Sequence, residues 1–301
     1  MHGLTSVIVV TANSGALSVE CIDRVLKSSA TIELIVVDNA SSDGHTEAIE
    51  SRFGRDERLR ILRSPQNIGF GPACNQGRAH ARGDWLLILN PDCLLETDTI
   101  ERLRAAALDE PQAGLFGVRV VDPRGNGEKA SRRRDPTLRR ALNTLSGLSR
   151  LERRWPGLAG IEMPQLATGT EHEAVDAVSG ACLFVRAEVF DAVGGFDEEY
   201  FLHCEDLDLC RRIRDAGFEV VHVPSIALRH EQGSSSQRRP LFVSRHKHRG
   251  MWRYFRKFDP AARNPILRGL VWSGIWTHFL IKALGNGWKQ WRRNSIAIRE
   301  K

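Results

Sequence analysis

The stretch Leu86-Leu87-Ile88-Leu89-Asn90-Pro91-Asp92 decides the fold that the sequence predicts. Its first four residues form an unbroken apolar run, which is typical of a strand buried on both faces in an α/β sheet. Pro91 has no amide hydrogen to donate, so strand pairing should stop there and Asp92 should lie in a loop. Open α/β sheets bind ligands at this edge, and a carboxylate there suits a divalent cation shared with phosphate oxygens. Taken alone, the stretch also fits an ordinary Asn-Pro turn.

The composition is that of a globular protein, with 42% hydrophobic and 27% charged residues among 301. This length predicts one large domain with an appendage, or two modest domains, and allows an ample core without disulfides. The six cysteines form no Cys-x-x-Cys pair, which favours reduced, mostly buried thiols over disulfides or a zinc site. We expect no signal peptide, because the N-terminus runs almost directly into Val7–Val10 without a basic region or cleavage site.

The net charge of +6 is unevenly distributed along the chain. Residues 238–301 contain 16 Lys or Arg and two acids, which gives +14, whereas residues 1–237 contain 27 basic and 35 acidic residues, which gives −8. We therefore divide the chain into an acidic body, 1–237, and a basic, Trp-rich helical tail, 238–301. Such a tail predicts an anionic partner, either a membrane surface or a nucleic acid.

Apolar runs alternate with helical patterns through the first half of the chain. Strands expected at 6–10, 32–37, 60–62 and 86–89, with helices between them, predict a mainly parallel sheet with right-handed crossovers. The first strand is followed neither by Gly-x-Gly-x-x-Gly nor by a Walker sequence, which excludes the usual dinucleotide and P-loop sites. Instead the strand ends carry Asp and Asn side chains, which suit hydrogen bonds to a base and ribose: Asn13, Asp38, Asn39, Asn90 and Asp92.

Four motifs in this order resemble the inverting family 2 glycosyltransferases. They are Val-Val-Thr-Ala-Asn-Ser (9–14), Val-Val-Asp-Asn-Ala-Ser-Ser-Asp-Gly (36–44), Asn-Ile-Gly-Phe-Gly-Pro-Ala-Cys-Asn-Gln-Gly (67–77) and Leu-Asn-Pro-Asp (89–92). The resemblance covers roughly residues 4–235. It implies a GT-A fold, in which a mainly parallel sheet is flanked by helices, and within the family the chain looks most like bacterial rhamnosyltransferases, which extend lipid-linked polysaccharide precursors.

The resemblance also implies a donor, an acceptor and a metal. The donor would be a nucleotide-sugar, best dTDP-L-rhamnose with a UDP-sugar as the alternative, and the acceptor a polyprenyl-diphosphate-linked saccharide. Asp92 stands at the position of the Asp-x-Asp motif and, with His230, would hold Mg²⁺ or Mn²⁺. Ala12 replaces an aromatic residue common in the family, which leaves the nucleotide's identity open. The residues expected to bind the nucleotide are Thr11, Asn13, Asp38, Asn67, Gly71, Asn75, Asn90 and Asp92.

Glu205 and Asp206 fall in the first turn of a helix expected to stop at Gly217. Two acids at a helix start are common as N-terminal capping, but the same place keeps a carboxylate ionised and able to accept a proton. In the resembling family the Glu-Asp element supplies the general base. We assign that role to Asp206 and a contact with acceptor or donor to Glu205.

Residues 122–178 are the least readable part of the chain. The arginines at 132–134 and at 139–140 fit either a solvated charged face or a clamp for the acceptor's diphosphate. Ser179-Gly180 fits either the small-residue start of a strand or a contact with donor sugar and acceptor. The sugar and the linkage formed depend on this region and are not fixed by the sequence.

The tail interleaves basic and aromatic residues over 246–259, as interfacial helices do. Residues 269–281 are uncharged and mainly apolar, but they are shorter than the ~20 residues that a membrane span needs. We therefore expect a cytoplasmic protein, peripheral on the cytoplasmic face of the membrane. The alternatives are a helix packed on the body or on a second subunit, and RNA binding, for which no signature is present.

Two other functions are alternatives to glycosyl transfer. A sugar nucleotidyltransferase would need a basic, glycine-rich loop after its first strand, and Thr11–Gly15 has neither Lys nor Arg. A catalytically inactive homologue acting as an assembly partner would not need intact acids. The chain keeps Asp92, Glu205, Asp206 and His230.

Overall fold

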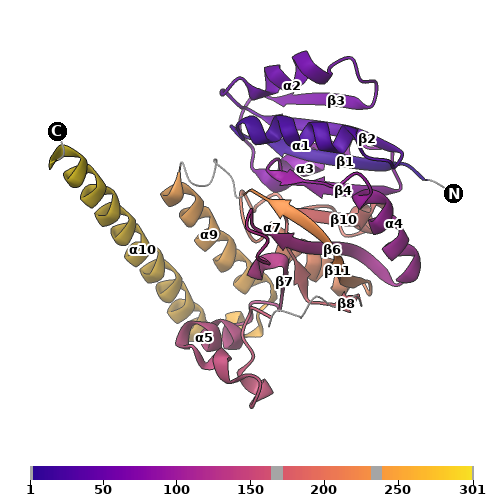
Figure 1. Ribbon diagram of the computed structural model, residues 1–301. Helices are drawn as coiled ribbons and strands as arrows, with labels where there is room; N and C mark the ends of the chain where they lie inside the picture. Colours follow the sequence, from indigo (N-terminus) through magenta and orange to yellow (C-terminus); the bar gives the residue numbers. More distant parts are fainter. Residues whose placement is uncertain (1–2, 164–171, 232–238, 300–301) are drawn as a thin grey trace.

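The computed structural model describes residues 3–163, 172–231 and 239–299, with side chains up to residue 285. Figure 1 shows a sheet with helices on both faces and two long C-terminal helices that lie to one side. The strands and helices, in chain order, are β1 (Thr5–Thr11), α1 (Ala16–Leu26), β2 (Ile32–Asn39), α2 (His45–Phe53), β3 (Leu59–Ser64), α3 (Phe70–Arg78), β4 (Trp85–Leu89), β5 (Cys93–Leu94), α4 (Thr99–Asp109), β6 (Ala113–Val121), β7 (Arg132–Arg133), α5 (Leu138–Ser146), β8 (Glu173–Ala174), β9 (Ala177–Val178), β10 (Cys182–Arg186), α6 (Ala187–Ala192), α7 (Glu205–Asp215), β11 (Glu219–His230), α9 (Pro240–Phe258) and α10 (Pro265–Arg299).

The strand order confirms the expected α/β fold with a mainly parallel sheet. In the described residues the order is β3-β2-β1-β4-β10-β6-β11-β5, and β8 pairs with β11. The first four strands in this order are mutually parallel, and β11 is parallel to β6. β10, however, runs antiparallel between β4 and β6, a direction that its apolar sequence did not indicate.

The sheet is covered on both faces, which is why its central strands are apolar throughout. Helices α1, α2 and α4 pack on one face, and α3, α6 and α7 pack on the other. The run 86–89 is fully buried, as predicted. Pairing of β4 ends at Leu89, so Asn90 and Asp92 lie in the turn before β5, as Pro91 requires.

Some element boundaries differ from those expected. Pro72, which suits the first turn of a helix, and Gly83, which suits its end, predict a helix between them. The observed helix, α3, begins earlier, at Phe70, and ends earlier, at Arg78, whose guanidinium donates to the Ala81 carbonyl. The apolar runs 220–223 and 226–229 form one strand, β11, because the pairing register shifts around Pro224 instead of breaking. A proline lacks the amide hydrogen for the ladder, and a bulge accommodates it.

All six cysteines are buried and free, as expected. Burial raises the pKa of the Cys21 and Cys93 thiols well above the usual range. These thiols are therefore neutral, apolar parts of the core.

The tail does not stand apart from the body along its whole length. In α9, Tyr254 and Phe255 are buried, and the Tyr254 hydroxyl donates to Asp135 at 3.0 Å. Lys257 of α9 bridges Asp197 and Asp208 at 2.7 Å each. α9 is thus packed on the body, as one interpretation of the tail predicts.

The last helix, α10, has 35 residues and extends away from the body beside α9 (Figure 1). It contacts α9 through a 3.0 Å hydrogen bond between His248 and His278. Its apolar side chains are largely exposed, among them Ile266, Leu270, Trp272 and Leu284. Within the described residues, no helix has the length and apolarity required to cross a bilayer.

Candidate active site

The two strand ends expected to bind the nucleotide lie side by side. Thr11 and Asp38 are register partners at the ends of β1 and β2. Both side chains are buried, and the Thr11 hydroxyl has no hydrogen-bond partner among the described residues. Asp38 accepts a hydrogen bond from the Ser41 amide at 2.9 Å. A buried, unsatisfied hydroxyl is costly unless a ligand or water satisfies it, so this edge is suited to polar ligand binding.

The expected amide residues hold the loops around this edge. The Asn13 carbonyl oxygen accepts from the Ser42 amide at 2.8 Å, which ties the loop after β1 to the loop after β2. Asn67 accepts from Asn39 and from the Gly69 amide, at 3.1 and 3.0 Å. The side-chain amide of Asn39, which the sequence suggested for base or ribose contacts, holds the 67–69 loop by hydrogen bonds to Asn67, Ile68 and Gly69. These contacts shape the loops, and a direct contact with nucleotide stays a prediction.

Asn75 and Gly71 face the segment before α7. The Asn75 side chain accepts from the Phe196 amide and donates to the Phe196 carbonyl, both at 2.9 Å. A Cβ on Gly71 would lie 3.1 Å from Phe196 Cβ and 3.8 Å from Glu205 Cβ. Both residues therefore have a clear packing role, which joins α3 to the start of α7.

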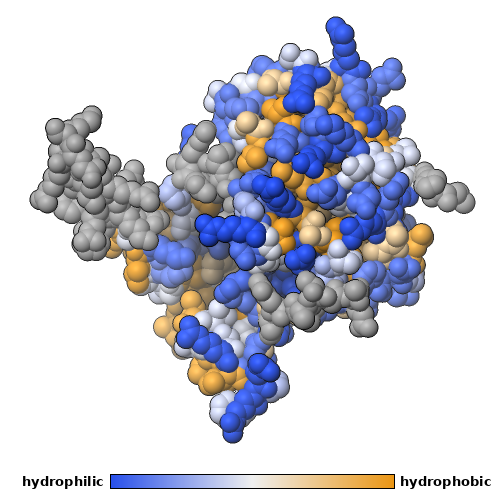
Figure 2. All heavy atoms as spheres, viewed as in Figure 1, coloured by the Kyte–Doolittle hydropathy of each residue, from blue (hydrophilic) through white to orange (hydrophobic). Residues whose placement is uncertain are grey.

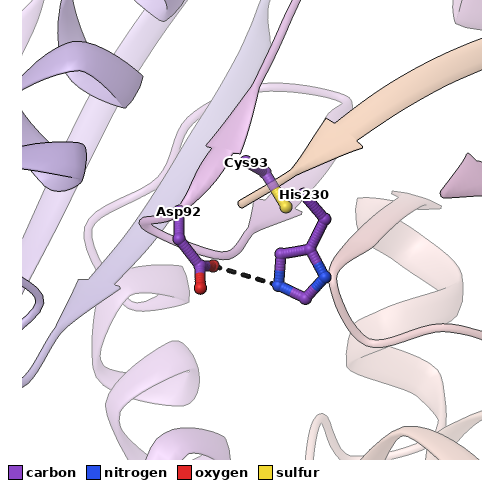
Figure 3. A group of neighbouring side chains, drawn as sticks. All are labelled: Asp92, Cys93 and His230. Atoms are coloured by element: carbon purple, nitrogen blue, oxygen red, sulfur yellow. Dashed lines mark ion pairs between the residues drawn. The ribbon is translucent and has the colours of Figure 1, made fainter. Parts of the chain in front are cut away.

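The expected metal ligands come together at the carboxyl ends of β4 and β11. Asp92 Oδ1 lies 3.2 Å from His230 Nε2, because β5 places Cys93 opposite His230 in the sheet. Figure 3 shows the Asp92 carboxylate directed at the imidazole, with the Cys93 sulfur beside them. The neighbouring Asn90 is partly buried. Its backbone amide donates to the Ala181 carbonyl at 3.0 Å.

Glu128 is a site residue that the sequence did not reveal. Its Oε1 lies 3.0 Å from His230 Nδ1, on the ring side opposite Asp92. The sequence did contain one signal for it, an acid shortly after the strand β6 in a largely basic stretch. β6 is parallel to β11 and ends at the same edge of the sheet, so this acid lies near His230. Burial alone would lower the pKa of His230, but Asp92 and Glu128 raise it to about 10. Without a metal the imidazole is thus a cation between two carboxylates, and a metal bound to Nε2 would displace the proton on that nitrogen.

These residues fit a divalent cation. A carboxylate oxygen and an imidazole nitrogen are ligands that Mn²⁺ accepts, while Mg²⁺ prefers oxygens. Metal-binding histidines typically donate their other ring N–H to a carboxylate, and Glu128 is placed to accept it from His230. Cys93 fits less well, because its buried thiol contacts the Ala181 carbonyl and its pKa is raised well above the usual range.

Glu205 and Asp206 begin α7, as the sequence predicted, but their environments differ. Burial would raise the pKa of Asp206, but Arg133 and the amides of Leu207 and Gly180 outweigh it and lower the pKa. Burial, followed by repulsion from Asp206, raises the pKa of Glu205 to about 8. Glu205 Oε2 has no hydrogen-bond partner among the described residues. Asp206 is therefore the ionised member of the pair at neutral pH.

The two oxygens of Asp206 have different partners. Oδ2 accepts from Arg133 Nη2 and from the Gly180 amide, the latter at 3.1 Å. Oδ1 accepts from the Leu207 amide at 2.9 Å, which is its only hydrogen bond within the described chain. Oδ1 is thus the oxygen with remaining capacity to take a proton from an incoming hydroxyl.

The arginines at 132–134 fit neither of the two interpretations suggested by the sequence. Arg132 is buried against Glu173, Arg133 pairs with Asp206, and Arg134 lies 3.1 Å from Glu152. They are internal ion pairs, neither a solvated face nor an open phosphate clamp. The partners are 18 to 73 residues away in sequence, so local pattern could not reveal them.

The turn at 179–181 connects Asp206 to the segment that carries Asp92, one of the expected metal ligands. The Gly180 amide binds Asp206, while the Ala181 carbonyl accepts from the Asn90 amide, two residues before Asp92. A Cβ on Gly180 would lie 3.1 Å from Asp206 Cβ. This turn precedes β10, whose antiparallel direction brings its start to the carboxyl end of β4. One short backbone segment therefore fixes the position of Asp206 relative to that of Asp92.

Comparison with known proteins identifies the family to which this chain belongs. Residues 6–169 match the family model for glycosyl transferase family 2, and the chain belongs to this family. It is therefore a glycosyltransferase.

Two relatives within this family are similar to the chain over most of its length. Proteins from two strains of Mycobacterium tuberculosis (CDC 1551 / Oshkosh and ATCC 25618 / H37Rv) are 30% identical over 250 residues, covering 76% of this chain and 79% of theirs. Both are named N-acetylglucosaminyl-diphospho-decaprenol L-rhamnosyltransferase. This agrees with the resemblance to bacterial rhamnosyltransferases.

Solved structures confirm the GT-A fold. A mannosyltransferase from Pyrobaculum calidifontis, in complex with GDP-Man and Mn²⁺, matches with a TM-score of 0.57 and 18% identity, over 93% of this chain and 75% of that one. Residues 1–349 of S. aureus TarS match with a TM-score of 0.53 and 18% identity, over 82% of this chain and 65% of that one.

Proposed function

We propose that this glycosyltransferase transfers L-rhamnose, with inversion, from dTDP-L-rhamnose to a hydroxyl group of a polyprenyl-diphosphate-linked saccharide in cell-envelope polysaccharide synthesis. The observation that carries the proposal is the ionised Asp206, joined through the 179–181 turn to the Asp92–His230 pair. The names of the mycobacterial relatives support this donor sugar and this acceptor class.

In the proposed reaction Asp206 is the general base. Arg133 and the Gly180 amide hold Oδ2, and Oδ1 removes the proton from the attacking hydroxyl as that oxygen reaches the anomeric carbon. A single displacement of this kind inverts the anomeric centre. The Arg133 ion pair keeps Asp206 deprotonated before the acceptor arrives.

The departing group is a nucleoside diphosphate. Asp92 and His230 would hold Mg²⁺ or Mn²⁺, with Glu128 orienting the imidazole. When bound, the metal neutralises charge that develops on the diphosphate. Mn²⁺ in the Pyrobaculum mannosyltransferase structure supports this choice of cofactor. On the other side of the site, Thr11 and Asp38 would contact the nucleotide, with Asn13, Asn67, Gly71, Asn75 and Asn90 lining or shaping its pocket.

The proposed location is the cytoplasmic face of the membrane, to which α10 would attach the enzyme. Support comes from the exposed apolar side chains of α10 and from the basic charge of residues 238–301. A lipid-linked acceptor places its reactive hydroxyl near a bilayer, so a peripheral enzyme meets it there. The division at 237/238 belongs to this proposal, although α9 packs on the body.

The test is a donor screen followed by a transfer assay. dTDP-rhamnose, UDP-GlcNAc, UDP-galactose and GDP-mannose are compared by thermal shift with Mn²⁺ or Mg²⁺. The preferred donor is then incubated with N-acetylglucosaminyl-diphospho-polyprenol, and the product is analysed by mass spectrometry and NMR. We expect stabilisation by dTDP-rhamnose and a product with inverted anomeric configuration. Stabilisation and transfer with a UDP-sugar alone would overturn the donor, and a retained configuration would overturn the mechanism.

A further inference from the structure

Helix α5 has its polar side inward and its apolar side outward, the reverse of a usual surface helix. Toward the body, Asn143 is buried and donates to the Ala159 carbonyl at 3.2 Å, and Arg140 pairs with Asp176 at 2.7 Å. The Thr144 hydroxyl accepts from the Ile161 amide at 3.0 Å. These contacts fix the orientation of α5, so its apolar side is held facing outward.

The outward side is a set of large apolar side chains. Leu142 and Leu145 are 55% and 74% exposed, and Trp155 is 53% exposed. We call the α5 apolar face the surface formed by Leu142, Leu145, Leu148, Leu151 and Trp155. Figure 2 shows hydrophobic residues gathered on the lower lobe, where Figure 1 places α5. Large apolar side chains exposed within one short segment are typical of an interaction site.

The charges around the α5 apolar face indicate which kind of partner it binds. Between residues 138 and 155 there are five arginines and a single acid, Glu152, which is engaged by Arg134. Four of these arginines are exposed: Arg139, Arg150, Arg153 and Arg154. Apolar and aromatic side chains surrounded by arginines match the boundary between anionic headgroups and acyl chains, where a Trp and the stems of Arg are both accommodated.

The position of α5 supports the same partner. The Leu138 amide donates to Asp259 at 2.6 Å, so α5 starts at the corner between α9 and α10. The exposed apolar side chains Ile266 and Leu270 belong to the first turns of α10, next to this corner. We propose that the α5 apolar face binds the surface of an anionic bilayer and gives the enzyme a second membrane contact besides α10. The proposal rests on the proposed function in its membrane location.

Two membrane contacts, through α10 and through the α5 apolar face, restrict the orientation of the enzyme on the bilayer more than one contact does. A single helix could attach the enzyme while leaving the body free to rotate about it, whereas a second contact on the body fixes which side faces the lipid. Arg133 and the α5 segment both lie in the stretch between β6 and β10, so the bilayer contact is part of the same insertion that holds Asp206.

The test compares full-length variants by vesicle co-sedimentation. The double variant Leu142→Ser/Leu145→Ser is measured against wild type and against Leu108→Ser, which changes a leucine that is 83% exposed on α4. Vesicles are phosphatidylcholine with and without phosphatidylglycerol. We expect the double variant to bind anionic vesicles about tenfold less tightly than wild type, and Leu108→Ser to bind like wild type. The three proteins should show the same thermal shift with donor, which confirms that the fold is kept.

Three results would overturn the proposal. The first is equal anionic-vesicle binding by the double variant and wild type. The second is a wild-type dimer, detected by light scattering, that the double variant dissociates without any change in vesicle binding, which would assign the face to a second copy. The third is no wild-type binding to vesicles at all. Glycosyl transfer to a detergent-solubilised acceptor is assayed in parallel, so the loss of the membrane contact is distinguishable from a failure of the proposed reaction.

Discussion

At the scale of single residues, Glu205 and Asp206 show how one helix start gives two adjacent carboxylates opposite properties. Arg133 and the Gly180 amide stabilise the charged form of Asp206, while Glu205 is buried without a partner for Oε2. Pairs of acids whose environments separate their pKa values are a common arrangement for acid–base chemistry. The separation supports Asp206 as the proposed base and leaves a proton on Glu205 at neutral pH.

Replacing the base should remove turnover and leave donor binding intact. Asp206→Asn keeps the shape and an acceptor oxygen for Arg133, but the amide cannot take a proton. We expect kcat to fall by about 10²–10⁴-fold, with donor affinity by calorimetry changed little. Asp215→Asn, at the other end of α7, is the matched control, because Asp215 is exposed and forms a surface ion pair with Arg211. Turnover near the wild-type rate in Asp206→Asn would exclude this residue as the base.

The raised pKa of Glu205 predicts a pH-dependent cost to stability. The unfolded chain loses this proton near pH 4.5, whereas the folded protein keeps it up to about pH 8, so stability falls as pH rises between these values. Glu205→Gln cannot ionise and should raise Tm by a few degrees at pH 8, with a gain that shrinks toward pH 4.5. Thermal unfolding across this range measures it, with the exposed Glu188→Gln as control. A gain that does not vary with pH would contradict the assignment.

Glu128 should matter for metal affinity through His230. Removing the carboxylate beside Nδ1 frees the imidazole to rotate and lose its alignment with Asp92. We expect Glu128→Ala to weaken Mn²⁺ binding, measured by calorimetry or electron paramagnetic resonance, about 10–100-fold. Glu128→Gln, which can still accept from Nδ1–H, should recover part of it, and the exposed Glu162→Ala should bind like wild type. If wild type binds Mn²⁺ and Glu128→Ala binds it equally well, Glu128 has no such role.

At the scale of elements, the sequence predicted features that depend on neighbouring residues, and it did not predict those that depend on residues distant in the chain. The buried run of β4 and the acids at the start of α7 follow from residue pattern alone. The antiparallel direction of β10 could not be predicted, because an apolar run reads the same whichever way the strand is paired. The partner of Arg133 lies 73 residues away, so no pattern of spacing could identify it.

The packing of α9 gives a prediction about truncation. Removing residues 238–301 exposes the body surface now covered by Tyr254 and Phe255, each contributing about 1.5–3 kcal/mol of burial, and leaves Asp135 without the Tyr254 hydroxyl. We expect residues 1–237 to aggregate or to unfold well below the full-length protein, and residues 1–263 to unfold within a few degrees of it. Scanning calorimetry of the two shortened chains decides this. Equal Tm values for the two would show that α9 adds no stability.

At the scale of the whole molecule, charge and apolar surface are segregated. The acidic body carries the site, while residues 238–301 carry +14 and end in the exposed helix α10, which is about 52 Å long. Basic charge attracts the chain to anionic lipid, and apolar side chains anchor it there.

This segregation predicts how binding should depend on salt and on the tail. The full-length protein should bind vesicles containing phosphatidylglycerol, more weakly as salt is raised, because surface charge is screened within a Debye length of about 10 Å at 0.1 M. Residues 1–263 should bind clearly less, since they lack α10. Co-sedimentation over a salt series measures both effects. Binding by residues 1–263 that equals full length would mean that α10 is not an anchor.

The reversed strand β10 also has a consequence for the order of folding. Leu89 pairs with Cys182, so this pairing closes a loop of roughly 90 residues, which is entropically costly and slow to form. During synthesis the β1–β4 block emerges first and can pair within itself, because its contacts are shorter in range. Asp92 is then present, but Asp206, His230 and the turn that aligns them are not. The enzyme should therefore gain its proposed base and complete its proposed metal site together, in one late, cooperative step.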